Sequence, residues 1–224
     1  MAIAYDTFTN GGFSSSTTHT YSHTCTGSDR ILFVQAFIAE NIDKITGVTY
    51  NGVAMDLVNK GTPLGARYNY LFVLAAPASG ANNVVITCSS SSTPGGNSTS
   101  YTGANQTGQP DASQSQLVTG TTITNTVTTV ADNCWAVLVA IGAPSAASTN
   151  TTFRGANGTF GDAKMFDNNA DITPAGDYTM TTTSNNSGDT QYLQASFAPV
   201  PPPPQLKTIG GLAIASVKSY NGLT

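Results

Sequence analysis

The hydrophobic positions of this chain fall into short runs separated by polar, turn-forming residues. Four runs are nearly continuous and have the length of a β-strand: ILFVQAFIA at 31–39, YLFVLAA at 70–76, VVIT at 84–87 and CWAVLVAI at 134–141. Runs of this kind, bounded by turns, are typical of strands buried on both faces. Residues 121–130 and 177–183 alternate instead between apolar and polar positions, as half-exposed strands do. The pattern therefore predicts strands rather than helices.

One turn is signalled strongly. Asn51-Gly52 is flanked by apolar residues and predicts a β-hairpin within residues 45–58, because a type I′ turn needs positive φ at both central positions. Counting the runs gives about eight to ten strands before Pro199, with residues 191–198 as the last. That number is typical of an all-β, antiparallel two-sheet sandwich of jelly-roll-like form. We therefore expect residues 1–198 to form one sandwich domain.

A proline-rich segment, residues 199–205, follows the last expected strand. Consecutive prolines favour polyproline II, so we interpret this segment as a semi-rigid linker, of which residues 199–204 span roughly 19 Å at ~3.1 Å per residue.

The remaining tail, residues 206–224, is apolar but too short to form a core of its own. Residues 207–213 and 218–224 share the order basic, hydroxyl, apolar, any, Gly, Leu, small, at a spacing of 11 residues. Such a tail needs a surface to pack against, so we expect it to dock onto a partner. The expected contact residues are its large apolar side chains: Ile209, Leu212, Ile214, Val217, Tyr220 and Leu223.

Composition supports strands and argues against several kinds of partner. Thr, Ser, Asn and Gly make up 95 of the 224 residues, and these residue types favour turns and Thr-rich strands over helices. The net charge is -4, with 8 basic and 12 acidic residues, whereas nucleic-acid binding needs clustered Lys and Arg. The longest apolar run, residues 31–39, is too short to span a membrane. We expect neither a nucleic-acid nor a membrane partner.

We expect the three cysteines and the two histidines to have structural roles. Cys25, Cys88 and Cys134 show no tight spacing, and we expect them to be small buried hydrophobic residues. His19 and His23 lie in a Thr/Ser-rich segment that favours a strand. On a strand they share one face but are separated by ~13 Å between Cα atoms, too far to chelate one ion. A polar edge strand is the favoured interpretation.

Residues 167–171 read D-x-N-x-D, the opening of a calcium-binding loop. An EF-hand would next require Gly and Glu at the positions held here by Ile172 and Tyr178, so the EF-hand interpretation fails. A looser calcium site in a loop of the sandwich stays open.

No motif in the chain predicts catalysis. There is no nucleophile elbow, no phosphate-binding loop and no dinucleotide-binding fingerprint. Glu40 is the sole glutamate, and most aspartates sit in turn-like contexts beside glycine. We expect a protein that is not an enzyme, with no catalytic residue, cofactor or metal.

The tail KTIGGLAIASVKSYNGL resembles the short "NGLA-x-ASVK-x-x-NG" endings of structural proteins of tailed bacteriophages. The body segments HTYSHTCTGSDRILFVQAFIA, VTYNGVAMDLV, LFVLAAPASGANNVVIT and SYTGANQTGQP are similar to a β-sandwich module found in phage sequences. The resemblance implies a virion structural protein: a capsid decoration, a head fibre or a tail-fibre component. Its implied partners are other capsid or tail proteins, and by analogy it forms a homo-oligomer, with a trimer favoured.

The N-terminal segment agrees with this localisation. Residues 1–6 lack a basic n-region and an apolar core, so we expect no secretory signal and assembly into the virion in the host cytoplasm.

Two other functions stay open. A carbohydrate-binding or adhesion module would use the same sandwich, and Tyr68, Tyr70, Tyr101 or Phe160 would offer rings for stacking on glycans if they are exposed. A secreted glycan hydrolase is the least favoured, and would require two neighbouring aspartates.

Overall fold

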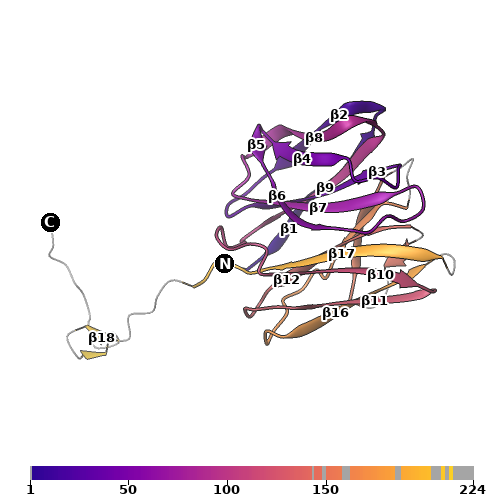
Figure 1. The fold of residues 1–224 in the computed structure, drawn as a ribbon. Coiled ribbons are helices and arrows are strands. Elements are labelled where there is room, and N and C mark those ends of the chain that lie inside the picture. The colour runs from indigo at the N-terminus through magenta and orange to yellow at the C-terminus, as the bar shows by residue number, and fades with distance from the viewer. Residues whose placement is uncertain are drawn as a thin grey trace.

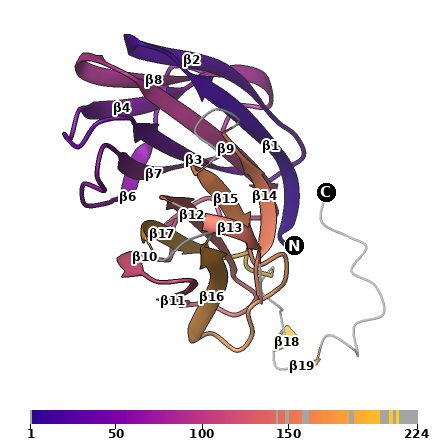
Figure 2. The same cartoon turned by 90° about the vertical axis from the view of Figure 1, so that its right-hand side faces the viewer.

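The computed structural model of the chain describes residues 2–142, 144–147, 150–157, 162–184, 188–202, 208–209 and 212–213. Four antiparallel sheets pack face to face in successive layers (Figures 1 and 2). The predicted all-β, antiparallel sandwich architecture is confirmed. None of the described residues forms a helix long and apolar enough to cross a membrane.

The first sandwich is built by the N-terminal half of the chain. Its outer sheet, in spatial order, contains β2 (Ser16–Cys25), β8 (Gly80–Ser92), β4 (Ile45–Tyr50) and β5 (Val53–Ala54). Its inner sheet contains β1 (Ala4–Phe13), β9 (Pro94–Thr102), β3 (Ile31–Ile38), β7 (Tyr68–Ala75) and β6 (Asp56–Lys60).

The second sandwich follows in the C-terminal half. Its inner sheet contains β10 (Ala112–Thr119), β17 (Asp189–Phe197), β12 (Trp135–Ile141), β15 (Lys164–Asp167) and β14 (Thr152–Ala156). Its outer sheet contains β11 (Thr122–Thr128), β16 (Asp177–Ser184) and β13 (Pro144–Ala147). The two inner sheets face each other at the centre of the stack (Figure 1).

The two sandwiches share one topology. The inner orders β1-β9-β3-β7-β6 and β10-β17-β12-β15-β14 become identical when the strands are matched in chain order, and so do the outer orders β2-β8-β4 and β11-β16-β13. The registers also match: Ile31 of β3 pairs with Tyr101 of β9, and Trp135 of β12 pairs with Phe197 of β17. The body is therefore two copies of one sandwich, and only the first copy contains an additional outer strand, β5, among the described residues.

Matching turns reinforce this equivalence. Asp29, with φ 50°, lies two residues before β3, and Asn133, with φ 62°, lies two residues before β12. Gly80, with φ 84°, opens β8, and Gly176, with φ 153°, immediately precedes β16. Asp, Asn and Gly are the residues that tolerate positive φ, so each copy bends its chain at the same points with compatible residues.

Each interface between layers has its own hydrophobic core. The central buried group lies between the inner sheets and joins the two sandwiches: Ile3, Ile31, Phe33, Leu71, Val73, Tyr101, Ala104, Trp135, Val137, Val139, Met165, Leu193, Ala195 and Phe197. Separate clusters fill the first sandwich around Val34 and Tyr50, and the second around Leu138 and Tyr192. A continuous central core of this size makes the described body one packed unit.

The strand predictions are confirmed where the chain is apolar and incomplete where it is polar. The four apolar runs lie in β3, β7, β8 and β12, the alternating segments form β11 and β16, and the last strand is β17. The hairpin is confirmed too, with Asn51 and Gly52 at φ 50° and 76° between β4 and β5. The expected count of eight to ten strands and two sheets was too low: among the described residues, seventeen strands in four sheets precede Pro199. The jelly-roll connection stays a prediction.

Candidate functional site

The predicted docking tail is described only in part. Thr208–Ile209 and Leu212–Ala213 form a short antiparallel hairpin, β18–β19, in which Ile209 pairs with Leu212. For these residues the structure describes the backbone alone. The other predicted contact residues, Ile214, Val217, Tyr220 and Leu223, lie outside the described residues. Docking through these six side chains stays a prediction.

The point where the chain leaves the body is well defined. Pro199 forms a β-bridge with Ala104, and the Val200 N–H donates to the Gly103 carbonyl at 2.9 Å. The Asn105 N–H donates to the Ala198 carbonyl at 2.8 Å. Residues 103–105 form the start of the connection between the two sandwiches. The exit is thus fixed by backbone hydrogen bonds immediately before the prolines.

His19 and His23 lie on β2, at the edge of the first outer sheet, as the strand interpretation predicted. Their side chains, however, are buried, with exposed fractions of 6% and 1%. His19 contacts the Gly11 carbonyl through Nε2 at 2.9 Å, and His23 contacts Thr9 Oγ1 through Nδ1 at 2.9 Å. Both rings thus tie β2 to β1 of the neighbouring sheet rather than facing solvent.

A serine, a histidine and an aspartate meet beside His23. The Ser100 hydroxyl donates to Asp6 Oδ2 at 2.8 Å and lies 3.1 Å from His23 Nε2. In a catalytic triad the histidine stands between serine and aspartate, so that it can accept the serine proton. Here the serine stands in the middle, its proton is directed at Asp6, and it is fully buried. Asp6 also accepts from the Thr26 N–H at 2.8 Å, so the group fastens the loop after β2 to both sheets.

Acid should destabilise the protein through His23. Burial lowers the pKa of His23 to about 4, although nearby Asp6 opposes the shift. The unfolded chain, with a pKa near 6.5, therefore takes up a proton that the folded protein does not, and stability falls as pH drops from about 6.5 to 4. Between pH 7 and pH 5 we expect urea unfolding to show a loss of about 2 kcal/mol from this residue. His23→Gln should flatten the pH profile in this interval, and an unchanged slope in the variant would refute the assignment.

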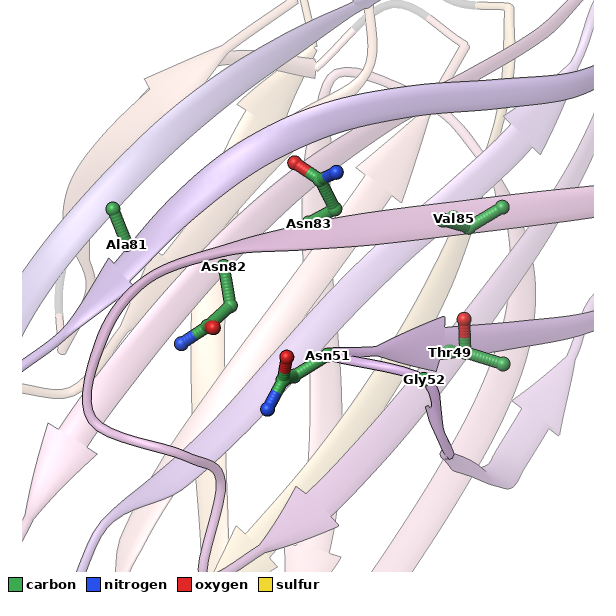
Figure 3. A pocket seen from close by; sticks show the side chains of 7 residues that line it. All are labelled: Thr49, Asn51, Gly52, Ala81, Asn82, Asn83 and Val85. Atoms are coloured by element: carbon green, nitrogen blue, oxygen red, sulfur yellow. The ribbon is translucent and has the colours of Figure 1, made fainter.

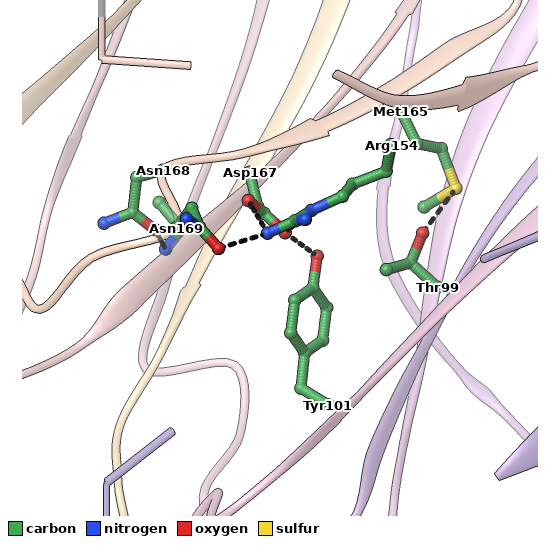
Figure 4. Close-up of polar contacts among 8 residues, drawn as sticks. Thr99, Tyr101, Arg154, Met165, Asp167, Asn168 and Asn169 are labelled. Carbon is green, nitrogen blue, oxygen red and sulfur yellow. Dashed lines mark hydrogen bonds and ion pairs between the residues drawn. The ribbon is translucent and has the colours of Figure 1, made fainter. Parts of the chain in front are cut away.

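Side-chain oxygens of the D-x-N-x-D segment, residues 167–171, bind a cationic side chain of the same protein, the guanidinium of Arg154. Arg154 Nε donates to Asp167 Oδ2 at 2.6 Å, and Arg154 Nη2 donates to Asp167 Oδ1 at 2.9 Å and to Asn169 Oδ1 at 2.6 Å (Figure 4). Asp171 Oδ1 accepts from Trp135 Nε1 at 3.1 Å. The oxygens that the calcium interpretation required thus already have a guanidinium and an indole as partners.

This ion pair connects the two sandwiches. Asp167 and Arg154 belong to the second sandwich, while Tyr101 of β9 donates its hydroxyl to Asp167 Oδ2 at 2.9 Å (Figure 4). The guanidinium carbon of Arg154 also lies 3.9 Å from the ring centroid of Tyr5, on β1 of the first sandwich. Asp167 is fully buried and the Arg154 side chain is 12% exposed. Burial raises the pKa of Asp167, and Arg154 and Tyr101 oppose that rise.

The other residues considered as metal ligands or as stacking surfaces for glycans have structural roles. The three cysteines are free and buried, as predicted. Tyr68, Tyr70 and Tyr101 are buried in the cores, so they offer no glycan-stacking surface, and Phe160 lies outside the described residues. Across the described ranges, no three His, Cys, Asp or Glu side chains gather closely enough to hold a metal ion.

No protein-family model, curated protein or solved structure matches the chain significantly.

Proposed function

We propose that the protein is a non-enzymatic structural component of a bacteriophage particle, displayed on its surface and attached through the C-terminal tail. The observation that carries the proposal is the exit of the chain from the body. Backbone hydrogen bonds from residues 103–105 hold residues 198–200 in place, and a run of prolines follows at once. A fixed exit and a semi-rigid linker hold a body away from the surface on which its tail is bound.

The tail supports attachment by its composition. It carries two lysines, no acidic residue and the six large apolar side chains predicted to make contact. Burial of those side chains alone does not offset the entropy lost by ordering the segment, so the bound tail should also form backbone hydrogen bonds. The β18–β19 hairpin suits that role, because the outer edges of a two-stranded hairpin can add to a sheet of the partner.

The body supports the proposal by fold-level analogy. In each sandwich, three consecutive strands alternate between the sheets (β1-β2-β3 and β10-β11-β12), and the last strand lies beside the first. We interpret each sandwich as a modified jelly roll, an architecture used by viral capsid proteins and by lectins. In this interpretation neighbouring copies on the particle associate as a homo-oligomer around a symmetry axis, and a trimer is favoured by analogy alone.

Fractionation of particles tests the proposal. Particles purified by density gradient from a lysate that expresses the protein should contain it at a constant ratio to the major capsid protein. Quantitative mass spectrometry of the gradient gives this ratio, and electron microscopy with an antibody against the body locates the protein. Recovery solely in particle-free fractions would contradict the proposal.

A further inference from the structure

A shallow depression lies on the first outer sheet, beside the Asn51-Gly52 turn (Figure 3). Its volume is about 390 Å³, within the usual range for small-molecule sites. Its polar lining comes from β4, the turn and the start of β8: Thr49, Asn51, Asn82 and Asn83. Figure 3 shows the amides of Asn51 and Asn82 projecting into the same gap, with Asn83 on the other side of β8.

The depression belongs to one of the two equivalent sandwiches. Asn51 and Gly52 form the turn that leads into β5, and β5 has no counterpart in the second sandwich among the described residues. This hairpin contributes little to the core, because both residues of β5 are exposed and Val53 is 53% exposed. Burial of apolar area therefore does not explain why the first copy alone has it.

The chemistry of the lining selects a neutral, hydrogen-bonding ligand. The seven described residues that form it include no charged side chain, so it offers no opposite charge to a phosphate or a carboxylate. The side-chain amides of Asn51 and Asn83 have no hydrogen-bond partner among the described residues. Each amide presents donors and an acceptor together, which matches adjacent sugar hydroxyls, and Val85 adds an apolar surface for a C–H face.

Asn82 helps to hold the depression in shape. Its Nδ2 donates to the Ser79 carbonyl at 3.1 Å and contacts the Tyr50 hydroxyl at 3.4 Å. Tyr50 is fully buried, and its hydroxyl donates to the carbonyls of His23 and Gly80, each at 3.1 Å. The floor beside the turn is therefore fixed to the core of the first sandwich.

We propose that this depression binds a neutral saccharide of one or two units that lies across β8, with Asn51 on one side of the strand and Asn83 on the other as the principal hydrogen-bonding residues. Such a site would let the body recognise glycans in addition to its structural role. The proposal is independent of the tail, since every residue in it belongs to the body.

Titration of the full-length protein with saccharides tests the site. The probes are the methyl glycosides of glucose, galactose, mannose and N-acetylglucosamine, together with lactose, maltose and cellobiose, each raised to tens of millimolar. Side-chain and backbone amide signals of Asn51, Asn82 and Asn83 are followed by ¹⁵N NMR. At least one probe should shift these signals saturably while leaving signals of the second sandwich unchanged.

Variants separate recognition from folding. Asn51→Gly removes the amide but tolerates the positive φ of the turn, and Asn83→Val suits a strand; each should weaken binding roughly fivefold to tenfold. The matched control is Asn150→Gly, because Asn150 is exposed in the second sandwich with φ 61°, and it should bind as the unmodified protein does. Absence of saturable shifts with every probe, or equal affinity in all three variants, would overturn the proposal.

Discussion

Replacing Arg154 by Met should lower the stability of the whole body by about 3–5 kcal/mol. The change leaves the carboxylate of Asp167 fully buried without its guanidinium partner, and it also removes the contact with the Tyr5 ring. For a protein of this size, a loss of that magnitude lowers Tm by roughly 6–20 °C. Thermal unfolding followed by circular dichroism measures the effect.

Two comparisons make this result specific. Arg67→Met breaks an ion pair with Asp162 whose side chains are 38% and 24% exposed, and such pairs contribute about 0–1 kcal/mol. The double variant Arg154→Met, Asp167→Leu removes the buried charge with its partner and should recover much of the stability. If Arg154→Met and Arg67→Met destabilise equally, the buried network does not hold the two sandwiches together.

Separating the two sandwiches should abolish the native state of each. A fragment of residues 1–104 exposes the central face of its inner sheet, including Phe33, Leu71 and Tyr101, and residues 105–202 expose Trp135 and Phe197. Exposed apolar faces of this extent drive association. We expect each fragment alone to aggregate or to lack a cooperative transition, and the two co-expressed fragments to form a soluble complex.

Size-exclusion chromatography and circular dichroism distinguish the outcomes. Residues 1–202, which keep both sandwiches, serve as the control and should unfold cooperatively. Two fragments that are each monomeric and fold independently would contradict a shared central core.

The apolar runs were sufficient to predict the strands at the centres of the sheets. Buried strands of polar residues were not predicted. The clearest case is β9, PGGNSTSYT, where every residue but the last is buried. A Cβ on Gly96 would lie 2.7 Å from Ile86 of the facing sheet, so glycine permits close approach of the layers at this point, while one on Gly95 would lie 2.5 Å from the ring of Phe37, its partner on the neighbouring strand β3. The hydroxyl of Ser98 lies 2.6 Å from that of Tyr21. Such partners make a polar strand stable in the interior, but they are invisible to a count of hydrophobic residues.

The repeat of one sandwich topology in the two halves of the body was not predicted from the sequence, for a related reason. Equivalent positions in the two copies keep their burial but not their chemistry, as His23 and Val127 illustrate on β2 and β11, where both side chains are buried. Turn residues are more informative, since Asp29 and Asn133 both adopt positive φ before the matching strand. The short similarity at a spacing of 11 residues was found in the tail, whereas the repeat that organises the body is a topology.

Some features of the candidate sites were predicted from the sequence, and others were not. Sequence spacing placed His19 and His23 correctly on one face of an edge strand, but it gave no sign that both rings would be buried. The D-x-N-x-D segment does bind a positive group, and the group is Arg154, which lies thirteen residues before Asp167. At the depression beside Asn51 the sequence predicted the turn but no binding site, because the lining is assembled from two strands that are distant in the sequence.

Deletion of residues 206–224 tests attachment through the tail most directly, with the copy number of the protein on purified particles as the measurement. The truncated body should keep the circular dichroism and cooperative unfolding of the full chain, yet be missing from the particles. Leu212→Asp combined with Leu223→Asp should mimic the deletion, and Ser219→Asp, which adds charge at a polar position of the tail, should be incorporated normally. Incorporation of the truncated protein at the full copy number would contradict docking through the tail.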